Sequence, residues 1–261
     1  MQKKIVISAS RRTDIVDCYP EFFIDKLNEI PSETVHTIVI WTKNPANILV
    51  NQVLNKKLKE YRQIYIHLTV TGMGGTELEH GIPESDKIFS ILPALIDFVS
   101  GPERITWRFD PIIRIIKNGT FFTNFVFFDY LLEKISRLGI KTCRTSWVFP
   151  YKKVLNHLEK KRFRLIVPSE SEMKEDYQYM NTKLGEKNMS LLICAVSGFP
   201  GSSCIDGQLF TRLHPEKLFC STLRAHGQRE FCGCTESFDI GSYGLKCKNG
   251  CLYCYANPFI M

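Results

Sequence analysis

Three cysteines near the C-terminus, Cys247, Cys251 and Cys254, have the spacing C-x3-C-x2-C. Three thiolates this close in sequence can bind three irons of a cubane [4Fe–4S] cluster, leaving the fourth iron without a protein ligand. An iron with an open position can bind a small molecule. The triplet therefore predicts an iron–sulfur site with room for a ligand.

A zinc site is the alternative for the same cysteines, because C-x2-C half-sites with a second cysteine pair nearby usually bind tetrahedral zinc. Such a site typically has two C-x2-C pairs. Here the three cysteines form one unit and the nearby pair, Cys232 and Cys234, is C-x-C. The spacing favours iron, and both interpretations predict a bound metal.

With an aromatic residue, Tyr253, directly before its last cysteine, the motif resembles the signature of the radical S-adenosylmethionine (SAM) enzymes. The resemblance implies that SAM chelates the open iron and that the reduced cluster cleaves it to a 5′-deoxyadenosyl radical. It also implies an electron donor such as flavodoxin or ferredoxin. In such enzymes the cofactor carries out the difficult chemistry, and the protein positions and shields it.

The other seven cysteines fall into two groups. Cys204, Cys232 and Cys234 lie in loops, where they bind a second iron–sulfur cluster or a zinc ion, or remain unligated, since no spacing rule links position 204 to 232. The other four are expected to fill the core, Cys143 and Cys194 in strands and Cys18 and Cys220 in helices.

Composition suggests one enzyme-sized domain in the cytoplasm. The 261 residues are 44% hydrophobic, and the formal charge of +7 suits either solubility or an anionic substrate. We expect no signal peptide, no membrane span and no disulfides among the ten cysteines. The expected organisation is a single barrel-like domain over residues 1–261, with a cysteine-rich segment, 198–261, packed on the barrel rim.

Strand-like and helix-like segments alternate along the chain, which predicts an α/β fold with a parallel sheet. No G-x-G-x-x-G fingerprint follows a strand, and we therefore favour a TIM-like (β/α) barrel or partial barrel over a doubly wound sheet. The expected strands are 4–9, 35–41, 64–70, 105–109, 143–149 and 191–196. The expected helices are 46–59, 83–99, 124–138, 169–184 and 214–224.

Charged residues gather after the expected strands, and in such barrels the active site lies at the carboxyl ends of the strands. Arginine can bind a carboxylate or phosphate in a bidentate manner, and aspartate can accept from a ribose hydroxyl or an amino group. For a single residue such as Asp14, a helix N-cap is the simpler interpretation. The candidates for cofactor or substrate contacts are Arg11, Arg12, Asp14, Lys43, Arg108 and Asp110.

Taken together, these features resemble an uncharacterised family, a domain of unknown function whose members carry a C-terminal cysteine cluster similar to that of radical SAM proteins. The matching residues are 8–14, 203–207, 232–234, 239–241 and 247–257. The resemblance implies a metal site but no known substrate. In ordinary radical SAM enzymes the cysteine loop follows the first strand, so the resemblance implies a permuted fold here. Gly74-Gly75-Thr76-Glu77 only loosely matches the glycine-glycine-glutamate segment that binds the SAM amino group.

Two rival functions remain. The basic segment 151–164, with interleaved aromatics, suggests a metal-stabilised nucleic-acid-binding protein without radical chemistry. The simpler interpretation of that segment is a solvated helix with Val154, Leu155 and Leu158 turned inward. The other rival is a metal-free hydrolase or lyase that uses Asp14 and Asp110 as a carboxylate pair. The substrate, a small molecule or a nucleic acid, is not identified by the sequence.

Overall fold

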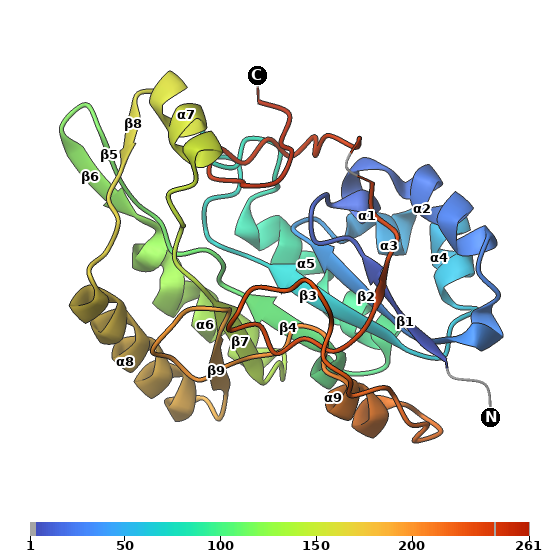
Figure 1. The fold of residues 1–261 in the computed structure, drawn as a ribbon. Helices are drawn as coiled ribbons and strands as arrows, with labels where there is room; N and C mark the ends of the chain where they lie inside the picture. The colour runs from blue at the N-terminus through green and yellow to red at the C-terminus, as the bar shows by residue number, and fades with distance from the viewer. Residues whose placement is uncertain (1–3, 243, 261) are drawn as a thin grey trace.

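A computed structural model describes residues 4–242 and 244–260 and shows a mixed α/β fold around a parallel sheet (Figure 1). The sheet has seven strands in the order β10-β1-β2-β3-β4-β7-β9, every neighbouring pair being parallel. All six strands expected from the sequence are confirmed in this sheet, in which only the short β10 was missed. The strands are β1 (Ile5–Ala9), β2 (Val35–Thr42), β3 (Ile64–Thr69), β4 (Ile105–Arg108), β7 (Thr142–Thr145), β9 (Ser190–Ile193) and β10 (Phe238–Asp239).

The strand order has two ends, so a closed barrel is not confirmed for the part of the chain that the structure describes. One end is β9 and the other is β10, which pairs with β1 through Ile7 opposite Phe238 and Ser8 opposite Asp239. The last strand of the chain therefore lies beside the first.

Helices follow most of the strands. They are α1 (Ile15–Cys18), α2 (Pro20–Asn28), α3 (Ala46–Val50), α4 (Gln52–Leu58), α5 (Ser85–Val99), α6 (Phe128–Arg137), α7 (Lys152–Lys160), α8 (Glu170–Glu186) and α9 (Gly207–Leu213). Short 3-10 helices cover Ser32–Thr34, Pro102–Arg104 and Asn124–Phe127. Within the described residues no helix is both long and apolar enough to cross a membrane.

Local capping explains where these helices differ from the expected ones. The helix expected over 46–59 is interrupted at Asn51, which ends α3 and caps α4 by accepting from the backbone N–H of Leu54. The prediction of a helix over 214–224 is wrong. The preceding segment is helical instead: α9 begins after its N-cap Asp206 and ends at Leu213. It ends there because helical geometry is disfavoured for the residue before Pro215.

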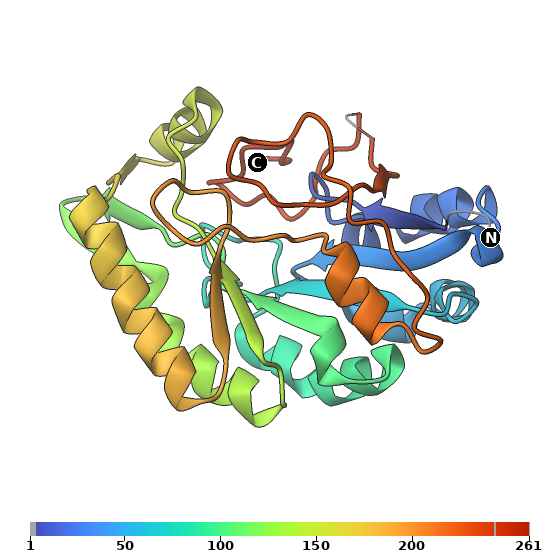
Figure 2. The ribbon, with the colours of Figure 1, turned by 60° about the horizontal axis from the view of Figure 1, so that its bottom comes forward.

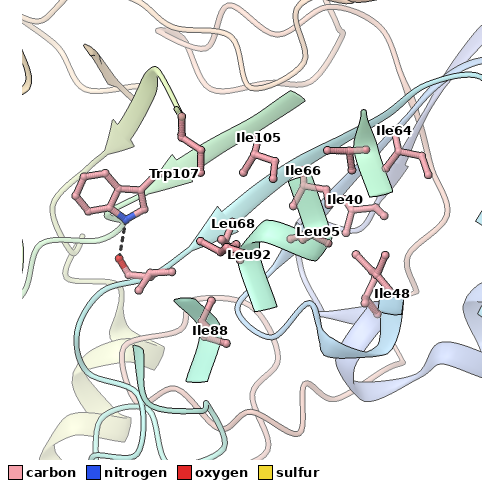
Figure 3. Packing of buried hydrophobic residues seen from close by; sticks show 14 of the residues in the cluster. Ile40, Ile48, Ile64, Ile66, Leu68, Ile88, Leu92, Leu95, Ile105 and Trp107 are labelled. Carbon is pink, nitrogen blue, oxygen red and sulfur yellow. Dashed lines mark hydrogen bonds between the residues drawn. The ribbon is translucent and has the colours of Figure 1, made fainter. Parts of the chain in front are cut away.

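Alternating side chains bury both faces of the sheet. On one face Ile40, Ile66 and Leu68 pack against Leu92 and Leu95 of α5 (Figure 3). Each such side chain contributes about 1.5–3 kcal/mol when it is fully buried. This continuous apolar face is what fixes the strands in register.

The other face is covered by the C-terminal segment, because Val39 and Tyr65 pack there against Ile205 and Phe210. In Figure 2 the loops of this segment, orange to red, lie along the top of the molecule with the orange helix α9 below them, across the sheet from α5 and α6. The cysteine-rich segment is therefore packed directly on the sheet.

A small antiparallel sheet, absent from the sequence interpretation, supports the end of the chain. It consists of β5 (Arg114–Lys117), β6 (Thr120–Thr123) and β8 (Phe163–Leu165) in the order β6-β5-β8. With α7 it buries Ile115 and Leu158 in one cluster with Cys251, Leu252 and Tyr253. The last two cysteines of the triplet region are thus held in a hydrophobic core.

Candidate metal and cofactor site

A cavity of about 470 Å³ opens at the carboxyl ends of the central strands, within the size range of small-molecule sites. It brings together residues that are far apart in sequence. Its lining includes all six candidate contact residues and all three cysteines of the tail triplet: Arg11, Arg12, Asp14, Lys43, Arg108, Asp110, Cys247, Cys251 and Cys254.

Backbone hydrogen bonds fix the loop that carries the triplet. The N–H of Leu252 donates to the carbonyl oxygen of Leu78 at 3.1 Å, and the N–H of Gly81 donates to that of Asn249 at 3.2 Å. A Cβ atom at Gly81 would lie 2.7 Å from the Asn249 Cα, so this close approach requires glycine. The loop after β3 therefore positions the cysteines.

Cys247 lies in surroundings that favour its thiolate. The Cys18 Sγ is 4.0 Å from the Cys247 Sγ, and backbone N–H groups of Asp14 and Asn249 also point at this sulfur. The hydrogen bond from Cys18 lowers the pKa of Cys247 to about 6, although burial opposes the shift. Cys18 lies in a helix and is buried, as expected, but it also contacts the triplet.

The other two triplet cysteines are more enclosed. Burial raises the pKa of both Cys251 and Cys254, while the positive charge of Lys43 acts in the opposite direction on each. Among the residues that the structure describes, no group of three or more His, Cys, Asp or Glu side chains is arranged so that it could hold a metal ion. As the loop stands, the three sulfurs share a cavity, and binding a metal requires them to turn toward a common centre.

A buried polar network links the triplet loop to the sheet. The Lys43 Nζ lies 2.8 Å from the Glu79 Oε1 and 2.9 Å from the Tyr253 hydroxyl oxygen, and Thr71 donates to the same Glu79 oxygen at 2.6 Å. Burial alone would lower the pKa of Lys43, but Glu79 and then Cys251 raise it above its ordinary value. Lys43 therefore remains charged beside the cysteines.

The aspartates at the rim are both engaged. Asp110 accepts from Arg108 and from the Ser146 hydroxyl. Burial lowers the pKa of Arg108. Asp110 and then Cys204 raise it, and together the raising contributions exceed the effect of burial, so the net shift is upward. This pair forms one fixed polar corner of the cavity.

Asp14 is the N-cap of α1 and also accepts from the Thr42 hydroxyl at 2.9 Å and the Lys43 N–H at 2.7 Å. Burial raises its pKa to about 8. The interpretation of Asp14 as a helix N-cap therefore agrees with its position in the structure. Asp110 lines the same cavity, but the hydrogen bonds of both carboxylates are directed at other groups, which gives no support to an acid–base pair.

The remaining rim arginines differ in position. The guanidinium of Arg11 lies 5.3 Å from the centre of the Trp41 ring and donates to the Gln228 side chain at 2.9 Å. Arg12 lines the cavity beside it.

The sequence analysis missed two residues that contribute to the site. Glu79 pairs with Lys43, and Arg229 lines the cavity. Glu77, in the loose glycine-glycine-glutamate match, instead pairs with a lysine at the surface.

Cys204, Cys232 and Cys234 also come together in the structure, on the tail-facing side of the sheet. Cys204 and Cys234 are buried and Cys232 is half-buried. Cys194 was expected to fill the core within a strand, but it follows the end of β9, is half-buried and approaches Cys204. Cys220 is buried as expected, although it lies outside any helix because α9 ends before Pro215.

The basic segment forms α7 and the start of β8. Val154 and Leu158 are buried, as the simpler interpretation expected, whereas Leu155 is 39% exposed and faces away from the core. Phe149 and Tyr151 beside α7 line the cavity and are exposed, and so is Tyr255. The rings of Phe149 and Tyr151 are 4.6 Å apart, and those of Tyr151 and Tyr255 are 5.9 Å apart.

One family model matches residues 6–256, and its description is a domain of unknown function (DUF1848). No curated protein and no solved structure gave a significant match to the chain. The match supports the expected likeness to an uncharacterised family over nearly the whole chain, and it assigns no chemistry.

Proposed function

Because the chain belongs to the DUF1848 family, which has no assigned activity, we propose its function from the site alone: a radical SAM-type iron–sulfur enzyme. Cys247, Cys251 and Cys254 would hold the cluster, which when bound supplies electrons for reductive cleavage of SAM to a deoxyadenosyl radical. We further propose that the open sheet is a permuted partial barrel. The reductant would be a small donor such as flavodoxin or ferredoxin in the cytoplasm.

The observation that carries the proposal is the shared cavity. Three cysteines with the C-x3-C-x2-C spacing line the same space as the charged residues at the strand ends. Its volume of about 470 Å³ suits a ligand of nucleoside size. A zinc knuckle needs no such cavity beside its sulfurs, because a structural zinc site is closed.

The chain's own residues would perform distinct tasks. Lys43 places a positive charge next to Cys251 and offsets the negative charge of thiolates. The Arg108–Asp110 corner presents a fixed donor and acceptor to a polar ligand group. Apolar lining from Trp41 and Val148 excludes water, which protects a reactive intermediate.

The test is metal and sulfide analysis of full-length protein purified without oxygen, followed by reduction in the presence of SAM. We expect brown protein, acid-labile sulfide and release of 5′-deoxyadenosine. Cys251→Ala should abolish product release, whereas the matched control Cys220→Ala, a buried cysteine outside the cavity, should keep it. Colourless, zinc-loaded protein that cannot be reconstituted with iron would refute the proposal.

The three exposed aromatics favour a second candidate function, binding of single-stranded nucleic acid. Phe149, Tyr151 and Tyr255 form a row of neighbouring rings at the cavity, next to the basic helix α7. Bases stack on such rings, each worth about 1–3 kcal/mol, and lysines contact the phosphates.

Fluorescence anisotropy with mixed-sequence DNA and RNA oligonucleotides tests this function. Affinity should fall steeply as salt rises, and Tyr151→Ala should weaken binding about tenfold or more. The exposed Phe121 on β6 provides the control, since Phe121→Ala removes a ring away from the cavity. Absent binding, or binding insensitive to salt, would exclude this function while leaving the SAM assay unaffected.

A further inference from the structure

We propose that Cys194, Cys204, Cys232 and Cys234 form a second metal centre with four thiolate ligands, separate from the tail triplet. The four thiols form a chain of neighbours. The Cys204 thiol interacts with those of Cys194 and Cys234, and the Cys234 thiol interacts with that of Cys232. Four thiolates complete the shell of a structural zinc ion or of a cubane cluster.

Two loops are built to bring these cysteines together. Ser202 pairs with Cys232, and the Gly233 N–H donates to the Ser202 carbonyl oxygen at 3.2 Å. A Cβ atom at Gly233 would lie 2.7 Å from the Ser203 Oγ, so glycine permits the close approach. The pairing continues where the N–H of Thr235 donates to a carbonyl of the other loop.

Backbone amides converge on one of the sulfurs. The N–H groups of Cys204 and Ile205 both point at the Cys234 Sγ, with nitrogen–sulfur distances of 3.2 and 3.4 Å. Amide donors directed at a sulfur stabilise its thiolate form, which is the form that ligates metal. These two N–H groups would donate equally to the sulfur of a metal-bound Cys234 thiolate.

Buried positive charge faces the same cysteines. Arg144 is only 3% exposed, and within the described residues its Nε and Nη1 atoms have no hydrogen-bond partner. Its neighbour in the strand, Cys143, faces the opposite core, which directs Arg144 to the tail-facing side, where it acts on Cys204. Leaving guanidinium N–H groups buried without acceptors is costly, and an anionic group beside Arg144 would reduce that cost.

Two more arginines lie near the same cysteines. The Nη2 of Arg229 lies 3.8 Å from the Cys194 Sγ, and the positive charge of Arg108 also acts on Cys204. A divalent metal or an oxidised cubane with four thiolates carries two net negative charges. Such a centre would place negative charge beside Arg144, whereas four neutral thiols would not.

As they stand, the four sulfurs are not arranged around a common centre, and binding a metal requires them to turn toward one. Because Cys194 also lines the main cavity, the second centre would lie against the cavity wall. It would fasten the cysteine-rich segment to the sheet, since Cys194 follows β9 while the other three ligands lie in that segment. Zinc and an iron–sulfur cluster share this chemistry, and the experiment separates them.

The test starts from full-length Cys247→Ala/Cys251→Ala/Cys254→Ala protein, purified without oxygen, in which only the second centre can persist. We expect one metal centre per chain, either zinc without sulfide or iron with equimolar sulfide. Adding Cys194→Ala should accelerate metal loss to a chelator at least tenfold, whereas adding Cys220→Ala should not. Circular dichroism establishes that each variant is folded.

Arg144→Gln provides a variant that keeps every proposed ligand. In the same triple-alanine background it should accelerate metal loss to the chelator about tenfold, because the counter-charge is removed. Folded triple-alanine protein without metal, even after anaerobic incubation with zinc or with iron and sulfide, would overturn the inference. Retained metal together with wild-type protein that does not cleave SAM would instead refute the proposed function and leave this centre in place.

Discussion

Replacing Lys43 with methionine tests whether the buried polar network supports the cysteine loop. The side chain of Glu79 is 2% exposed and that of Lys43 is 16% exposed, with 2.8 Å between Nζ and Oε1. Lys43→Met would leave the carboxylate buried with only hydroxyl donors from Thr71 and Tyr253. Removing one partner of a buried ion pair costs about 3–5 kcal/mol.

This loss corresponds to a decrease of about 6–20 °C in the melting temperature for a chain of this size. Thermal and urea unfolding of the purified variant measure it. Lys43→Met/Glu79→Gln should recover most of the loss, since the uncompensated charge is gone. Lys26→Met, which breaks an exposed pair with Glu29, is the control and should change stability by less than about 1 kcal/mol. Equal stability of Lys43→Met and Lys26→Met would refute the reasoning.

Two other perturbations test the packing beside the candidate sites. Burial, with a smaller contribution from His36, lowers the pKa of His214 to about 4, so the unfolded chain takes up a proton that the fold excludes. Stability should therefore fall as pH decreases from about 6.5 to 4, by up to about 3 kcal/mol for this group, and urea midpoints should show a smaller decrease in His214→Gln. An unchanged pH dependence in the variant would contradict this. Gly207→Ala places a Cβ 2.0 Å from the Ser221 carbonyl oxygen and should destabilise by about 1–3 kcal/mol in thermal unfolding. Gly185→Ala, also in a helix but in open space, should stabilise by up to about 1 kcal/mol, and the reverse order of the two glycine variants would be inconsistent with the structure.

The strands of the central sheet could be predicted from sequence because buried parallel strands are nearly continuous apolar runs. β2 illustrates this, since all eight of its residues are buried. β10 could not be predicted, because it is two residues long and exists only through its pairing with β1. The antiparallel strand β6 was missed because it has four residues and none of them is buried, so it lacks the apolar run that marks a central strand.

Within the candidate site, the residues at strand ends could be predicted because parallel strands present their carboxyl ends at one edge. Arg108 and Lys43 follow this rule. Glu79 could not be found in this way, since it lies in a loop ten residues beyond the end of β3, and only the fold brings it to Lys43. Cys194 was misjudged because an apolar run predicts a strand but not where the strand ends.

The pairing of β10 with β1 has a consequence for biosynthesis. Ile7 leaves the ribosome more than two hundred residues before its partner Phe238, so one border of the sheet stays uncovered during most of translation. Contacts of such wide sequence separation form slowly. The nascent polypeptide therefore carries an unpaired edge on β1 until its C-terminal segment has been synthesised.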